Sequence, residues 1–225
     1  AITVFILLTA RKETEMAQCG TKRAINMTDG PLFKNIFLYS LPLMFAQVLE
    51  VLFNLSDVAI AGKFADYRAL GAVGSTTLLV SLFTGFLIGM GSGVCVRVAH
   101  RLGVGDEDGA RRTVFSSGVA CLVIGLAVFA SCALFAVPML RLLNTKDELM
   151  DGASVYLRIY SLGMPAMAVY NFGNGVLSAC GETKKPLVYL TIAGVLNVIL
   201  NLFFVIVCGM AADGVAIASV IAQYL

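Results

Sequence analysis

Long apolar segments, each separated from the next by a short polar connection, repeat along this chain from Asp29 to its last residue. All but the last have about 20 to 28 residues, enough for a helix to cross the roughly 30 Å hydrocarbon core of a bilayer. With 59% hydrophobic and 13% charged residues, the 225 residues carry more apolar surface than one soluble core would bury. The pattern therefore predicts an all-α, polytopic membrane helical bundle.

The boundaries of the apolar segments predict six helices. We place them at about 37–60, 70–98, 114–137, 155–179, 187–209 and 214–225. The last stretch is too short to cross the hydrocarbon, so we expect an incomplete sixth helix. Residues 1–26 combine a short apolar run with a polar stretch, and we expect an N-terminal extension that is poorly ordered or not native. Residues 27–225 then form the transmembrane lobe.

Basic residues are distributed unequally between the two sides of the predicted bundle. Eleven lie before the first helix or around the connections after the second and fourth, and five lie on the opposite side. Because cytoplasmic loops are enriched in Lys and Arg, we expect a cytoplasmic N-terminus and a location in the plasma (inner) membrane. Tyrosines near the predicted helix ends fit interfacial belts. They are Tyr39, Tyr67, Tyr156, Tyr160 and Tyr189.

The first apolar segment, Leu38–Gly62, carries a stripe of four polar side chains. They are Gln47, Glu50, Asn54 and Asp57. At about 100° of rotation per residue, they fall within an arc of about 80° on one face of the helix. A carboxylate at this depth is costly unless it faces protein, water or a cation. The stripe is therefore the candidate functional site.

Other patterns bear on packing and on the class of protein. Gly85, Gly89 and Gly93 are spaced four residues apart in the second segment and predict close helix contact. Pro165, with the Asn and Gly residues of 171–175, predicts an interrupted fourth helix. We expect residues 106–108, which are all acidic, to lie in a solvated loop. The sequence contains no HExxH or CxxC motif and no nucleophile paired with a base, so we expect neither a metal site nor an enzyme.

Three stretches carry a more specific pattern: LPLMFAQVLEVLFNLSDVAIAGKF at 41–64, RLGVGDEDGARRTV at 101–114 and SACGETKKP at 178–186. Together they resemble the multidrug and toxic compound extrusion (MATE) family. Their order and spacing match the first of that family's two six-helix lobes. The resemblance implies a twelve-helix secondary antiporter that exports organic, often cationic, compounds against entry of protons or sodium ions. It implies no cofactor besides the coupling ion.

The resemblance also implies roles for particular residues. Asp57 lies where family members have an acidic residue facing the cavity of the N-terminal lobe, and Pro42 lies where some have a proline at which the first helix bends. Asn197 and Asn201 resemble a polar pair lining the same cavity, although some relatives have an acid at the second position. Their spacing places both amides on one helix face. We expect these residues and the stripe to form the ion-coupling and substrate cavity.

Two alternatives remain beside multidrug antiport. A lipid-linked oligosaccharide flippase of the same broad superfamily would share the helices and the polar lumen, but would need basic residues to meet a pyrophosphate. The stripe here is acidic and amide. The other alternative is a transport-incompetent fragment. For the antiporter, we expect a small organic substrate, the lipid bilayer and a second, C-terminal lobe as partners, and no nucleic acid.

Overall fold

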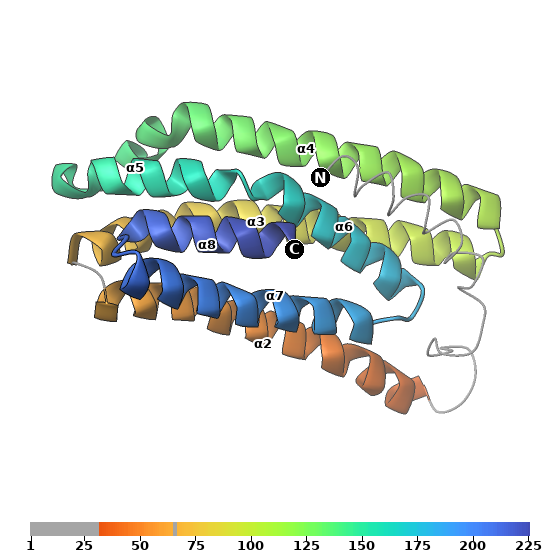
Figure 1. Ribbon diagram of the computed structural model, residues 1–225. Coiled ribbons are helices and arrows are strands. Elements are labelled where there is room, and N and C mark those ends of the chain that lie inside the picture. The colour runs from red at the N-terminus through yellow and green to blue at the C-terminus, as the bar shows by residue number, and fades with distance from the viewer. Residues whose placement is uncertain (1–31, 65–66) are drawn as a thin grey trace.

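Helices make up almost all of the chain that the structure describes (Figure 1). The computed structural model describes residues 32–64 and 67–225, so the extension expected at residues 1–26 lies outside the described residues. The elements are α2 (Leu32–Phe64), α3 (Tyr67–Gly103), α4 (Glu107–Leu142), α5 (Asp147–Ser161), α6 (Met164–Ala179), α7 (Lys184–Leu202), the π-helix η1 (Phe203–Val207) and α8 (Ala212–Tyr224).

Four helical segments are long and apolar enough to cross a membrane. They are Phe33–Phe64, Tyr67–Gly103, Glu107–Leu142 and Lys184–Val207. Large apolar side chains such as Phe45, Leu78 and Leu134 are exposed on their outer faces, as expected where lipid is the solvent. The all-α membrane bundle is confirmed. The helices extend beyond the predicted apolar segments because hydropathy marks the part embedded in lipid, whereas helical hydrogen bonding continues into the polar ends.

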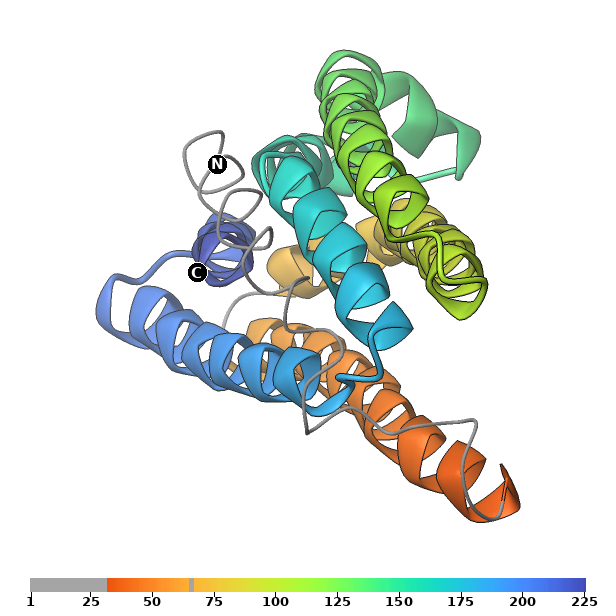
Figure 2. The same cartoon turned by 90° about the vertical axis from the view of Figure 1, so that its right-hand side faces the viewer.

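The helices pack in two groups that α8 connects (Figures 1 and 2). In the larger group, α3, α4, α5 and α6 pack against one another, while α2 packs along α7. Leu87, Leu140, Leu157 and Met164 are almost completely buried in the main apolar core. Helix α8 contacts α5 on one side and α7 on the other. Side chains on α8 are therefore placed between the two groups.

The interruption predicted within 155–179 separates α5 from α6. It falls at Leu162 and Gly163, whereas residues 171–175 are helical. Pro165 lies in the first turn of α6, where its missing N–H and its ring prevent the preceding helix from continuing. The Tyr224 hydroxyl of α8 donates to the Leu162 carbonyl at 2.8 Å, which satisfies a backbone acceptor at the break.

Close contact between α3 and α6 occurs at a different glycine from those predicted. A Cβ atom added at Gly85, Gly89 or Gly93 would meet no other group within 4 Å in the described part of the chain. Gly91 is buried, and a Cβ atom there would lie 2.5 Å from the Asn171 carbonyl oxygen. Gly175 of α6 in turn abuts the Gly91 carbonyl oxygen. The prediction of a seam along the three spaced glycines was wrong. Gly91 lies on nearly the opposite face of α3, two residues and so about 200° of rotation from Gly89, and that face packs against α6.

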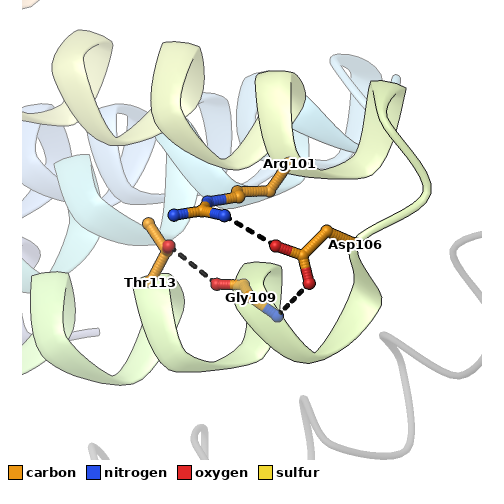
Figure 3. A network of polar contacts seen from close by, with 4 residues as sticks. All are labelled: Arg101, Asp106, Gly109 and Thr113. Atoms are coloured by element: carbon orange, nitrogen blue, oxygen red, sulfur yellow. Dashed lines mark hydrogen bonds and ion pairs between the residues drawn. The ribbon is translucent and has the colours of Figure 1, made fainter.

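The acidic run at 106–108 begins α4, and the expectation of a solvated loop there was wrong. Asp106 is the N-cap: its Oδ1 accepts a hydrogen bond from the Gly109 backbone N–H at 2.9 Å, and its Oδ2 accepts one from Arg101 Nη1 at 2.6 Å (Figure 3). The next two residues, Glu107 and Asp108, lie in the first turn, where carboxylates interact favourably with the helix dipole. The connection between α3 and α4 is therefore short and fixed at both ends.

This cap predicts a pH-dependent stability. Hydrogen bonding from the Gly109 N–H, and then from Arg101, lowers the pKa of Asp106 from its ordinary value. Because the folded-state pKa lies below the unfolded-state value of about 3.9, the stabilisation is complete above the unfolded value and disappears as the pH falls through the folded value. We expect Asp106→Asn to lower the unfolding midpoint at neutral pH, and this difference to vanish in acid, where protonated Asp resembles Asn.

The measurement is thermal unfolding of the intact protein in detergent across the acid range. Asp151→Asn, at an exposed carboxylate of α5, is the matched control and should change little at any pH. A difference for Asp106→Asn that persists undiminished in strong acid would contradict the charge-based explanation.

Candidate functional site

Asp57 is buried where α2, α7 and α8 meet. Its side chain is only 7% exposed, and each carboxylate oxygen accepts a hydrogen bond from a different helix. Asn201 Nδ2 of α7 donates to Oδ1 at 2.5 Å, and Ser219 Oγ of α8 donates to Oδ2 at 3.1 Å. A carboxylate surrounded by protein at this depth needs such donors, because charge-assisted hydrogen bonds offset its desolvation.

Two further hydrogen bonds close these residues into a ring. Asn201 Nδ2 also donates to Asn197 Oδ1 at 3.2 Å, and Asn197 Nδ2 donates to Ser219 Oγ at 3.2 Å. All four members are buried. The predicted residues Asp57, Asn197 and Asn201 are therefore brought together from positions up to 144 apart in the sequence. We call these four residues the polar ring.

The hydrogen bonds of the polar ring can form with Asp57 either ionised or protonated, and no heavy atom has to move between the two states. Ser219 Oγ lies within hydrogen-bonding distance of both Asp57 Oδ2, at 3.1 Å, and the Val215 carbonyl, at 3.0 Å. A hydroxyl has one proton to donate. When Asp57 is ionised, that proton can point to Oδ2; when Asp57 is protonated, Oδ2 can donate to Ser219 Oγ while the hydroxyl turns to Val215.

One oxygen of the ring has no protein donor. Asn201 Oδ1 is fully buried and accepts no hydrogen bond from any group in the described part of the chain. An unpaired buried acceptor carries a free-energy cost, so such atoms are uncommon away from functional sites. The described residues contain no group of three or more His, Cys, Asp or Glu side chains close enough to hold a metal ion. The ring thus offers one carboxylate with amide and hydroxyl oxygens.

The boundary between buried and exposed surface runs along the predicted stripe. Glu50 and Asp57 lie on its inner edge: Asp57 is buried and Glu50 is half-buried. Gln47 and Asn54 lie on the outer edge and are exposed, with Asn54 Nδ2 donating to the Glu50 backbone carbonyl at 3.0 Å. The structure therefore does not bring Gln47 and Asn54 into the polar ring. They belong to the surface beside it.

Two tyrosines expected in an interfacial belt instead lie inside the lobe near the polar ring. Tyr156 and Tyr160 of α5 are 4% and 5% exposed, and their rings stack with centroids 5.8 Å apart. Helix α5 packs against α8, which carries Ser219 of the polar ring. The belt interpretation was wrong for this pair. They face inward because α5 packs against α3, α4 and α8.

The MatE family model matches residues 42–203. The chain belongs to the MatE family. It is 29% identical over 203 residues to the probable multidrug resistance protein YpnP of Bacillus subtilis (strain 168), a match that covers 89% of this chain and 45% of YpnP. It is 24% identical over 201 residues to the probable multidrug resistance protein NorM of Thermotoga maritima, covering 85% of this chain and 42% of NorM.

A solved structure described as the outward-facing conformation of a multidrug resistance MATE family transporter of the MOP superfamily has the same fold. Its TM-score is 0.82 at 23% sequence identity, and the match covers 90% of this chain and 45% of that one. The MatE chain thus spans about half the length of the relatives it matches. This coverage is consistent with the expected N-terminal lobe of the family's fold.

Pro42 lies inside α2 of the MatE chain, about four turns before Asp57. The helix is continuous from Leu32 to Phe64 in this structure. Proline removes one backbone hydrogen bond from a helix interior and is the commonest cause of a kink. Bending of α2 at Pro42 stays a prediction.

Ser219 is the member of the polar ring that sequence reasoning missed. It lies in α8, six residues after Asp213 and four before Gln223, and nothing in the sequence of this helix connects it with the stripe on α2. Serine is common at helix contacts in membranes, so its presence alone indicates packing. Its role in the MatE chain depends on α8 packing against α7, which brings Ser219 to Asn197 from 22 residues away.

Proposed function

We propose that the protein carrying this chain exports organic, often cationic, compounds by antiport with protons or sodium ions, and that Asp57 binds the coupling ion. One observation carries the proposal: a buried carboxylate from α2 is held by side chains of α7 and α8 in the polar ring. Ion occupancy at such a point changes the interactions of three helices at once. It can therefore favour one of two helix packings, which is what coupling requires.

The charges of the buried and half-buried residues support the binding of a cation. Asp57 is the only charged side chain among the buried residues of the described ranges. Glu50 adds a second, half-buried carboxyl group nearby, and the unpaired Asn201 Oδ1 adds an oxygen of the kind that cations accept as a ligand. A flippase for a pyrophosphate-linked lipid needs the opposite polarity. We therefore favour organic cations over anionic lipids.

The exposed outer edge of the stripe supports a role in substrate binding. Gln47 and Asn54 lie on the face of α2 that the described helices leave uncovered. We propose that residues 27–225 form the N-terminal lobe, that this polar face borders the cavity shared with a second lobe, and that the N-terminus is cytoplasmic. Gln47 and Asp57 both follow Pro42 in α2, so bending there would move the ion-binding and substrate-facing side chains together relative to the part of α2 before Pro42.

The test is efflux from vesicles that contain the full-length protein. Ethidium is loaded, and a proton gradient or a sodium gradient is imposed separately. We expect efflux with at least one gradient, and only passive leakage when both are absent or collapsed. Efflux at the same rate without any ion gradient would contradict antiport, and anionic lipid movement without ethidium efflux would favour the flippase.

A further inference from the structure

A second polar site lies at the end of the lobe where α3 ends and α4 begins (Figure 1). The polar ring lies toward the opposite end, where α2 ends and α3 begins. A cavity of about 610 Å³ opens there between the two helices. This volume falls within the range of about 300–1,000 Å³ that is typical of small-molecule sites. Three arginines line it: Arg97 and Arg101 from α3, and Arg112 from α4.

Arg101 has a structural role in this cavity. Its guanidinium extends between the two helices to Asp106, which it contacts at 2.6 Å (Figure 3). Asp106 in turn caps α4 through Gly109, and the Thr113 hydroxyl donates to the Gly109 carbonyl at 2.8 Å. These polar groups are engaged with one another. They fix the wall of the cavity and leave its other arginines to meet a ligand.

Arg97 and Arg112 have no carboxylate within 4.0 Å in the part of the chain that the structure describes. Helices α3 and α4 run antiparallel through a short connection, so Arg97 near the end of α3 and Ser116 near the start of α4 both line the cavity. Arg112 and Ser116 are one turn apart on α4 and line the same cavity. Two exposed guanidinium groups and a hydroxyl group thus line one cavity from facing helices.

The charge of the lining favours an anion. Arg101 and Asp106 neutralise each other, which leaves Arg97 and Arg112 against the single carboxylate of Asp108. Guanidinium groups pair with phosphate oxygens through two parallel hydrogen bonds, and hydroxyls add a third donor. Asp108 belongs to the first turn of α4, one turn before Arg112 on the same helix face, so the lining as a whole keeps a single net positive charge.

We propose that this cavity binds the phosphate of an anionic glycerophospholipid headgroup. A lipid fits better than free phosphate because the cavity lies at the ends of two membrane-spanning helices. Exposed apolar side chains continue from it along those helices: Val96 is 67% exposed on α3, and Phe115 is 61% exposed on α4. Acyl chains would lie along this surface while the headgroup occupies the polar cavity. Basic pockets between membrane helices are established lipid sites in other proteins.

The experiment is native mass spectrometry of the delipidated full-length protein, titrated with phosphatidylglycerol or with phosphatidylcholine. We expect phosphatidylglycerol adducts to form preferentially, and the double variant Arg97→Gln with Arg112→Gln to weaken them about tenfold or more. The control is Lys184→Gln with Lys185→Gln, which removes the same charge at the same end of the lobe but outside the cavity (Figure 1). It should weaken binding little.

A charge-keeping variant and a measurement of folding test whether the effect is specific to the arginines. Arg97→Lys with Arg112→Lys keeps the charge and should retain more binding than the Gln pair, and thermal unfolding midpoints show whether each variant is folded. If Lys184→Gln with Lys185→Gln weakens binding as much as Arg97→Gln with Arg112→Gln, the proposed site is wrong. The lipid would then be attracted by the basic charge of that end of the lobe as a whole. Complete displacement of phosphatidylglycerol by inorganic phosphate, with the same arginine dependence, would overturn the lipid assignment. None of these outcomes depends on coupling at Asp57.

Discussion

Full-length protein with Asp57→Asn is expected to fold and to insert into the membrane, but to lose gradient-driven ethidium efflux by about tenfold or more, the scale of a typical coupling free energy. Asparagine can take the place of protonated aspartate in the polar ring. Its oxygen can accept from Asn201, and its amide can donate to Ser219, whose hydroxyl then turns to the Val215 carbonyl. The variant is thus held in one state of the cycle and cannot release a proton or bind a cation through a negative charge.

Two controls separate loss of coupling from loss of structure. Asp151→Asn changes an exposed carboxylate of α5 and should leave efflux unchanged. Ser219→Ala keeps the carboxylate but removes its donor on Oδ2, and we expect a smaller reduction of efflux than with Asp57→Asn. The measurement is initial efflux rate in vesicles with matched protein content. Undiminished gradient-dependent efflux by Asp57→Asn would eliminate this residue as the coupling group.

Gly175→Ala is expected to cause the largest loss of stability among single conservative changes, about 2 kcal/mol or more in the free energy of unfolding. The added methyl group would overlap the Gly91 carbonyl oxygen across the α3–α6 contact. That oxygen is part of the backbone of α3 and cannot turn away as a flexible side chain can. The two helices would have to separate, which would disturb Val94, Phe172 and Val176 in the smaller apolar cluster between them.

The matched control is the same change at Gly89. Its Cβ atom would meet no other group within 4 Å among the described residues, so Gly89→Ala should be neutral or stabilising by up to about 1 kcal/mol, because alanine is the better helix former. Thermal unfolding in detergent, followed by circular dichroism, measures both. Similar midpoints for Gly175→Ala and Gly89→Ala would show that the helices are not in tight contact at Gly91.

Three residues of the polar ring could be predicted from the sequence, and the fourth, Ser219, could not. A charged residue in an apolar segment is visible in one dimension, because its cost in lipid is high whatever its neighbours are. Asp57 was identified on that basis and by family position, the amide pair on α7 was identified by family position and by its shared helix face, and the structure joins all three. Ser219 carries no such cost. Its place in the ring follows only from the packing of α8, which is set by residues distributed over several helices.

The same limit explains the errors about glycine and tyrosine. Spacing of four along α3 identifies a face, but not whether another helix covers it. Gly85, Gly89 and Gly93 have such spacing and are open, whereas Gly91 packs against α6. Tyrosines near the end of an apolar segment suit an interface. Tyr156 and Tyr160 are buried because α5 is surrounded by α3, α4 and α8.

By itself, the sequence determined that this chain is a bundle of membrane helices with two costly acidic positions in its first apolar segment, Glu50 and Asp57, because hydrocarbon forces backbone groups into helices and penalises an unpaired charge wherever it occurs. Those are properties of each segment in its solvent. Only the tertiary structure decided which side chains complete the polar ring, which glycine meets α6 and which arginines share a cavity. Such facts depend on the relative positions of helices, and in lipid these are set by close packing and hydrogen bonds between helices that no single segment records.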